Sequence, residues 1–133
     1  MAKIRILPFN VLQFDTSAVT VTGTPDSGYP ESRLYDLSID FYWKYTNTGN
    51  ISVECDQGVG IDWPVVNTLI IDKHNFTGRT ISWEYSTNGS AWNDMVSSWV
   101  QGDNLQIVKE SAITTAYRYH KLTVAGAVDA EEN

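Results

Sequence analysis

The sequence has few of the residues that mark disulfide scaffolds or nucleic-acid-binding proteins. It contains a single cysteine, Cys55, among 133 residues, so no internal disulfide can form. Lys and Arg together number 9 against 16 Asp and Glu, which gives a formal net charge of -7. Because an acidic chain repels a phosphate backbone, we expect no nucleic-acid partner. A chain of 133 residues can still bury a sizeable core without metal or disulfide staples.

Long apolar runs are also missing. Lys3 and Arg5 lie near the start, but proline and polar residues interrupt the apolar residues that follow, from Pro8 to Asp15. The sequence therefore predicts neither a signal-peptide core nor a membrane-spanning segment. We expect a protein that is made in the cytoplasm and does not insert into a membrane.

The strongest strand signal lies between residues 66 and 92. Residues 69–72 form a short β-branched apolar run of the kind that a buried strand needs. Residues 80–86 alternate between apolar and polar side chains, the period of two that half-buries a strand. The apolar side chains of this second strand, which we predict to be core, are Ile81, Trp83 and Tyr85. Asn88 and Gly89 tolerate positive φ, so a tight two-residue turn is predicted there.

Further strands are predicted at short intervals, separated by Gly, Asn, Asp and Pro. They cover residues 4–7, 17–23, 51–55, 95–100, 105–108 and 116–124. One turn of helix could form over residues 29–36, since Pro30 suits a first helical position. This spacing of strands predicts an all-β fold, an antiparallel β-sandwich of the jelly-roll type. We expect one domain over residues 1–133, with a core over about 4–125 and an acidic tail at 126–133.

The lone cysteine falls inside one of these strands. Alternation places Cys55 on the same face as Ile51 and Val53. A buried and unreactive thiol is the prediction, because free cysteine usually behaves as a small apolar side chain.

Four motifs occur along the chain in a characteristic order. They are Tyr29-Pro30-Glu31-Ser32-Arg33-Leu34-Tyr35-Asp36 with Asp40 and Trp43, Asp56-Gln57-Gly58, Ser86-Thr87-Asn88-Gly89-Ser90-Ala91-Trp92, and Ala116-Tyr117-Arg118-Tyr119-His120-Lys121-Leu122. Together they resemble the galactose-binding-like or discoidin domains, also called coagulation factor 5/8 type C domains. The third resembles that family's Ser-x-Asp-Gly-x-x-Trp signature, with Asn88 in place of Asp. The resemblance spans about residues 17–124 and implies a β-sandwich jelly roll.

The resemblance also implies a possible structural calcium ion. In the family, the Asp of the Leu-x-Asp segment often helps to hold calcium, and Asp36 occupies that position here. A loop with Asp36, Ser38 and Asp40 can offer several of the oxygens that calcium needs. The alternative is that Asp36 caps the turn by accepting hydrogen bonds from backbone amides.

Catalysis finds little support in the sequence. The two histidines, His74 and His120, lie outside any recognisable nucleophile motif. His74 follows a predicted strand, where the ordinary role of histidine is to hydrogen-bond the loop backbone. His120 falls in an alternating strand, as a surface residue or as a hydrogen-bonded residue of the sandwich. We therefore predict that the protein is not an enzyme.

A sugar site would need aromatic faces with amides, carboxylates or arginine beside them to read hydroxyl groups. The chain has 5 Trp, 7 Tyr and 4 Phe, enough for a core and a site. The candidates that lie in or beside loops are Tyr29, Trp63, His74, Asn75, Phe76 and Arg79. Packing is the competing explanation for each of them, and Trp63 with Pro64 could simply plug one end of the sandwich.

Two hypotheses on function follow. Small stand-alone domains with a pair such as His74-Asn75 after the strand resemble accessory proteins of tailed-phage structural gene clusters. The primary prediction is therefore an accessory virion component of a tailed bacteriophage, a tail or capsid decoration or adhesion protein. Such a protein would bind other virion proteins or itself, and would reach the virion by assembly in the host cytoplasm. The alternative is a stand-alone, lectin-like carbohydrate-binding module that recognises cell-surface glycans.

Overall fold

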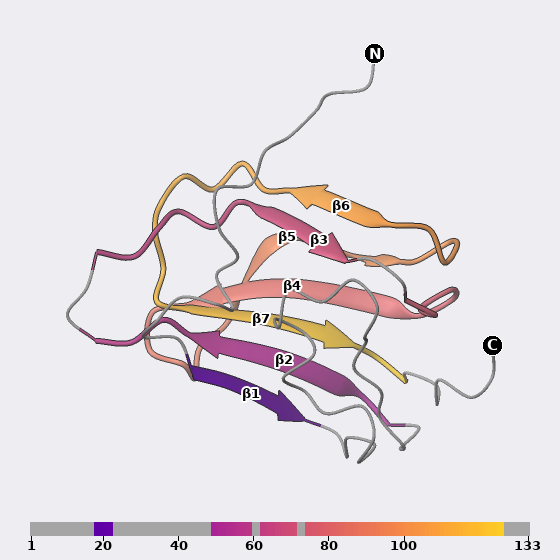
Figure 1. Ribbon diagram of the computed structural model, residues 1–133, viewed down its shortest axis with the longest axis horizontal. Coiled ribbons are helices and arrows are strands. Elements are labelled where there is room, and N and C mark those ends of the chain that lie inside the picture. The colour runs from indigo at the N-terminus through magenta and orange to yellow at the C-terminus, as the bar shows by residue number, and fades with distance from the viewer. Residues whose placement is uncertain (1–17, 23–48, 60–61, 72–73, 127–133) are drawn as a thin grey trace, which may run out of the picture.

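A computed structural model of the chain describes residues 18–22, 49–59, 62–71 and 74–126 (Figure 1). The strands are β1 (Ala18–Thr22), β2 (Ile51–Asp56), β3 (Thr68–Ile71), β4 (Thr80–Ser86), β5 (Asn93–Val100), β6 (Ile107–Glu110) and β7 (Tyr119–Val124). A five-stranded sheet has the order β1-β2-β7-β4-β5, and β3 pairs with β6 in a second sheet. Every pairing is antiparallel, so the fold is an all-β sandwich. Among the described residues, no helix has the length and apolar character to span a membrane.

The core lies where the apolar faces of the two sheets meet. Strand register sets Ile51 and Ile81 on either side of Val124. These three side chains are at most 2 % exposed, because alternation turns them all toward the same face. Ile107 of β6 packs in the same cluster and joins the second sheet to the first. Full burial of one such side chain stabilises the fold by about 1.5–3 kcal/mol.

The opposite face of the five-stranded sheet is polar. Register places Lys121 of β7 between Glu54 of β2 and Glu84 of β4. The Lys121 Nζ atom lies 3.8 Å from a Glu84 carboxylate oxygen and 3.9 Å from the centre of the Trp92 ring. Trp92, which follows the β4–β5 reversal, therefore packs back onto the sheet beneath an ammonium group.

Seven of the predicted strands are confirmed, with shifted ends in places. β6 begins at Ile107 instead of at residue 105. β7 begins at Tyr119 instead of at residue 116, because the Tyr117 carbonyl accepts a hydrogen bond from the Gln57 side chain, at 2.8 Å. The predicted burial of Cys55 and Trp83 is also confirmed, with 2 % and 3 % of these residues exposed. Tyr85 is half-buried, with its ring stacked 3.9 Å from that of Tyr117.

The predicted two-residue turn between β4 and β5 is wrong. The chain does reverse there, but β4 ends at Ser86 and β5 begins at Asn93, so the connection is a longer loop. Gly89 has a φ of 74°, as predicted for this position. The Asn88-Gly89 pair thus correctly predicted where the chain reverses, but it did not predict the length of the connection.

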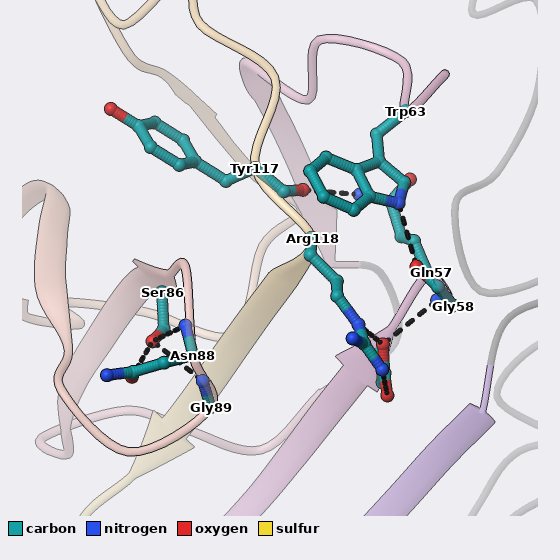
Figure 2. A network of polar contacts seen from close by, with 9 residues as sticks. Gln57, Gly58, Trp63, Ser86, Asn88, Gly89, Tyr117 and Arg118 are labelled. Atoms are coloured by element: carbon teal, nitrogen blue, oxygen red, sulfur yellow. Dashed lines mark hydrogen bonds and ion pairs between the residues drawn. The ribbon is translucent and has the colours of Figure 1, made fainter. Parts of the chain in front are cut away.

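Two side chains, Ser86 and Asn88, stabilise this loop by accepting hydrogen bonds from its backbone, and Figure 2 shows the bonds to Ser86. The Ser86 Oγ atom, fully buried, accepts from the amides of Asn88 and Gly89 at 3.2 and 3.0 Å. The Asn88 Oδ1 atom accepts from the amides of Ser90 and Ala91, both at 2.9 Å. Because side chains satisfy these four amides, the loop needs no tight hairpin turn.

Several predictions fall on residues that lie outside the described part of the chain. They are the strand at 4–7, the helical turn at 29–36 and the acidic tail beyond residue 126. The single domain over residues 1–133 also stays a prediction.

Candidate functional site

The two ends of the five-stranded sheet carry different loops. Because the strands are antiparallel, β2 and β4 begin where β5 and β7 end; the register pairs Thr80 with Val100 and Ile51 with Val124. We call this the Arg79 end; it contains residues 74–79 and 101–105 with Asn50 and Gly126. The other end, which we call the Trp63 end, contains residues 57–59, 62–67, 87–92 and 111–118. A strand of the length of β4 spans roughly 20 Å, so the two ends are far apart (Figure 1).

The candidate residues divide between these ends. His74, Asn75, Phe76 and Arg79 come together at the Arg79 end, because they are consecutive or nearly so in the β3–β4 connection. Trp63 lies at the Trp63 end, beside the last residues of β2. The structure therefore brings four candidates together and separates Trp63 from them.

An ion pair that the sequence analysis did not identify organises the Trp63 end (Figure 2). The Arg118 guanidinium donates to both carboxylate oxygens of Asp56, at 2.6 and 2.8 Å. The hydrogen bonds from Arg118 lower the pKa of the Asp56 carboxyl, and the amide of Gly58 acts in the same direction through a 2.9 Å bond. Both residues lie in motifs that carried the family resemblance, but 62 positions separate them in the chain. A pairing at that distance has no local sequence signal.

Trp63 is part of the same network. Its indole Nε1 donates to the Gly58 carbonyl at 2.9 Å, and the indole ring is half-buried. This is the only hydrogen-bonding group of a tryptophan side chain. Next to it, the fully buried Gln57 side chain donates to the Tyr117 carbonyl. Trp63 thus closes this end of the sandwich, which is the packing role weighed against ligand binding in the sequence analysis.

At the Arg79 end, both nitrogens of the His74 ring bond to the backbone. Nδ1 accepts from the Phe76 amide at 3.1 Å, so the ring proton resides on Nε2, which donates to the Leu105 carbonyl at 2.6 Å. The predicted role of His74 in bonding loop backbone is confirmed. Its ring also stacks on that of Phe76, with centres 5.1 Å apart and planes 22° apart. The pair forms a half-buried aromatic surface whose orientation two hydrogen bonds determine.

The backbone that carries Arg79 is tightly held. The Arg79 amide donates to the Phe76 carbonyl at 2.9 Å, and Gly78 has a φ of 77°, the left-handed conformation that a type II turn requires at its third residue. The Gly78 amide donates to the Gln101 carbonyl at 2.7 Å, and the Gln101 amide donates to the Arg79 carbonyl at 2.9 Å. The side chain of Asn104 accepts from the Thr77 amide and hydroxyl. Hydrogen bonds from residues 77–79 to Gln101 and Asn104 therefore hold this turn against the loop that follows β5.

The Arg79 side chain has a different environment from the other described cations. Lys109 lies over the Trp99 ring, Arg118 binds Asp56, and Lys121 lies between Glu84 and Trp92. Among the described residues, Arg79 has neither a carboxylate nor an aromatic partner, and its buried Nε atom has no hydrogen-bond acceptor. Gly126 lies beside Nη1 and donates through its amide to the Asn50 side chain. Arginine, amide and aromatic groups thus share one end of the sandwich.

His120 is the titratable group whose environment differs most from the sequence-based expectation. It is 5 % exposed, and neither ring nitrogen has a hydrogen-bond partner in the described part of the chain. The expectation of a surface residue is therefore wrong. Strand register sets His120 between Cys55 of β2 and Tyr85 of β4, on the inward face of the sheet. Burial lowers its pKa to about 4.

Three predicted site residues, Tyr29, Asp36 and Asp40, lie outside the described residues. The calcium site thus stays a prediction. Within residues 18–22, 49–59, 62–71 and 74–126, no group of three His, Cys, Asp or Glu side chains is arranged to hold a metal ion.

Comparison with known proteins gives matches in structure alone. No protein-family model matches the chain, and no curated protein matches it by sequence. The module CpGH89CBM32-6 produced by Clostridium perfringens has a TM-score of 0.72 at 16 % identity, with 90 % of each chain covered. A pectin-binding carbohydrate-binding module has a TM-score of 0.58 at 23 % identity, covering 82 % of this chain and 78 % of that one. The CBM32 module of AlyQ in complex with 4,5-unsaturated mannuronic acid has a TM-score of 0.57 at 22 % identity, with 84 % of each chain covered.

This chain has the galactose-binding-like, or discoidin, fold. The resemblance inferred from the sequence motifs is therefore confirmed at the level of fold, as is the antiparallel sandwich.

Within the discoidin sandwich, the motifs now have physical roles. Asp56, the first residue of the Asp56-Gln57-Gly58 motif, forms an ion pair with Arg118, which belongs to the last of the four motifs. In Ser86-Thr87-Asn88-Gly89-Ser90-Ala91-Trp92, the first and third residues cap loop amides, and the last packs beneath Lys121. The three motifs within the described residues therefore help to build the Trp63 end, including the β4–β5 loop.

Proposed function

We propose that the chain is a non-enzymatic carbohydrate-binding module with its sugar site at the Arg79 end. The observation that carries the proposal is the match in fold, over most of both chains, to modules described as carbohydrate-binding. Of these, one binds pectin and another was solved with 4,5-unsaturated mannuronic acid. The alternative function from the sequence analysis thus has better support than the primary one.

The Arg79 end offers the groups that sugar recognition needs. Phe76 packs against the core cluster, and the His74 ring stacked on it extends this apolar surface toward the loop, where it can receive the C–H face of a sugar ring. Asn75 lies between the two ring residues in the chain and Arg79 follows Phe76 by three positions, and both supply hydrogen-bond donors for hydroxyl groups. At the Trp63 end, in contrast, the polar groups of Trp63, Asp56 and Arg118 already bond to one another or to the backbone.

The two histidines support a role without catalysis. Both nitrogens of His74 bond to backbone groups, so the ring has no free site for a substrate proton. His120 is buried in the inward face of the sheet, away from any substrate. Neither residue can therefore serve as the general base of a nucleophilic mechanism.

The predicted role as a tailed-phage virion component has no support from the fold or from these comparisons, and it stays a prediction. Location in a virion and binding to other virion proteins depend on it and stay predictions as well. Carbohydrate binding does not exclude this role, since an adhesion protein on a particle would also need a glycan site.

The proposal is tested on a glycan array with the protein displayed multivalently, first with calcium and then with a chelator. We expect selective binding of one glycan class, and about a tenfold loss of affinity in Asn75→Ala through a lost polar contact. The matched control is Trp63→Phe, which removes the indole donor at the opposite end and should leave binding unchanged. Folded protein that binds no glycan would refute the proposal, as would loss of binding in the control alone. Loss of binding in chelator would support the predicted calcium ion.

A further inference from the structure

We propose that the ligand at the Arg79 end carries a carboxylate, so that the bound sugar is a uronic acid. This inference rests on the proposed function and names the chemical class of its ligand. It starts from one side chain, Arg79, whose guanidinium has no anionic or aromatic partner among the described residues.

The unsatisfied donor is the first argument. The Arg79 Nε atom is buried and lacks an acceptor, whereas its terminal nitrogens are not among the buried atoms without partners. A buried donor without an acceptor destabilises a protein, so the unpaired Nε atom shows that the fold itself does not satisfy this guanidinium. Arg79 as a whole is only half-buried, and the two terminal nitrogens of a guanidinium can bind a carboxylate through two parallel hydrogen bonds.

The chain itself contains an example of this pairing. Arg118 uses Nε and one terminal nitrogen to bind the two oxygens of Asp56, at 2.6 and 2.8 Å. At the opposite end of the sheet, Arg79 has the same donors, but none of the described carboxylates binds them. The nearest described acid along the loops, Asp103, accepts hydrogen bonds from the Gln101 side chain and the Leu105 amide instead.

The second argument is that the position of Arg79 is determined before a ligand arrives. Its amide and carbonyl both form backbone hydrogen bonds, to Phe76 and Gln101, each of 2.9 Å. Gly78, which the turn needs at a φ of 77°, holds the chain direction between these anchors. Because the backbone at Arg79 is already fixed, only its side chain loses conformational freedom on binding, and this favours a specific contact over a diffuse charge attraction.

The overall charge of the chain further restricts the kind of acidic glycan that it can bind. With a net charge of -7, the chain repels densely charged polyanions at long range. Physiological salt screens that repulsion beyond about 8 Å, whereas a direct guanidinium–carboxylate contact is screened far less. We therefore infer that the uronic acid is a short oligosaccharide or an isolated unit within a mostly neutral glycan.

The test compares sugars that differ only in the carboxylate. Oligomers of galacturonic, glucuronic and mannuronic acid are titrated by calorimetry, each beside its own methyl ester. We expect one acid to bind at least tenfold more tightly than its ester. Arg79→Gln should reduce that ratio to near one, and Arg79→Lys, which keeps the charge and loses the fork, should give an intermediate ratio. The matched control is Lys109→Gln, which removes a cation over Trp99 and should keep the full preference.

The outcomes separate the two proposals. Equal binding of acid and ester in every pair, or an unchanged preference in Arg79→Gln, overturns the carboxylate inference and leaves carbohydrate binding in place. Binding of no acid, no ester and no glycan on the array overturns the proposed function itself. Thermal melting shows whether each variant is folded, and if Arg79→Gln is not, an unchanged preference in Arg79→Lys overturns the inference.

Discussion

Mild acid should destabilise this protein through His120. The side chain is 5 % exposed, and neither ring nitrogen has a hydrogen-bond partner among the described residues. Burial lowers the pKa of His120 to about 4. The polar backbone of Tyr117 acts in the opposite direction, to raise this pKa, but offsets only part of the effect of burial. The groups that face it from the neighbouring strands are Cys55 and Tyr85, by register. Both are neutral in weak acid, because the Tyr85 pKa is raised by its hydrogen bond with Tyr117 and thiols lose their proton only in base.

The direction and size of the effect follow from the shift. In the unfolded chain, His120 takes up a proton near pH 6.5, whereas the folded protein resists protonation down to about pH 4. The unfolded state therefore binds more protons between these values, and the free energy of unfolding decreases as the pH falls through this window. Above pH 6.5 this contribution is fully retained. Each pH unit is worth about 1.4 kcal/mol, so we expect a loss of about 2 kcal/mol at pH 5.

Urea unfolding at pH 7.5 and pH 5.0, with His120→Leu as the reference, measures this loss. The variant removes the titrating ring and keeps every carboxylate, so the difference between the two proteins isolates His120. We expect the native protein to lose about 2 kcal/mol more than the variant between the two pH values. An equal loss in both proteins would refute the reasoning, as would a His120 pKa near 6.5 measured by NMR in the folded state.

Two further predictions concern the loops. Gly89→Ala should lower the free energy of unfolding more than Gly78→Ala does. Both glycines have a positive φ, 74° and 77°, but only at Gly89 would an added Cβ approach a neighbour, the Tyr119 ring at 3.1 Å. Urea unfolding should show a loss of about 1 kcal/mol for Gly78→Ala and about 2–3 kcal/mol for Gly89→Ala, and equal losses would contradict the Tyr119 contact. Ser86→Ala should cost about 2 kcal/mol, because it leaves two loop amides without their acceptor. The exposed Ser97→Ala on β5 should change stability by less than about 0.5 kcal/mol, and the same small value for Ser86→Ala would show that water replaces its hydroxyl.

The strands were predictable because their signal is local. Alternation along residues 80–86 identified β4 with its observed ends, and it placed Ile81 and Trp83 in the core. The same argument identified the buried face of β2 that contains Cys55. A period of two is a property of neighbouring residues, so no knowledge of partners is needed to read it.

The β4–β5 loop shows where local reasoning fails. The Asn88-Gly89 pair is a strong turn signal, yet the side chains of Ser86 and Asn88 bind amides farther along and lengthen the connection. The start of β7 was mispredicted for a related reason, since the Tyr117 carbonyl bonds to Gln57, a residue 60 positions away. In both places, a side chain competes with the regular backbone pattern.

The candidate site shows the same division. His74, Asn75, Phe76 and Arg79 could be grouped from the sequence because they are near neighbours in the chain. Trp63 was grouped with them as another loop aromatic, but the antiparallel order of the strands sets it at the opposite end of the sheet. Loop membership can be read from the sequence, whereas the end of the sandwich to which a loop belongs depends on strand direction and order.

The sequence by itself thus determined the class of fold, most of the strands and the buried faces, because alternation and turn chemistry act between neighbouring residues. The tertiary structure decided which loops share an end, and it paired Asp56 with Arg118 across 62 positions. It also decided that, among the described residues, the ring nitrogens of the buried His120 have no hydrogen-bond partner and the buried Nε atom of Arg79 has no acceptor. These features depend on strand order and register. Strand order and register arise from contacts between segments that are distant in the chain, so no local pattern in the sequence predicts them.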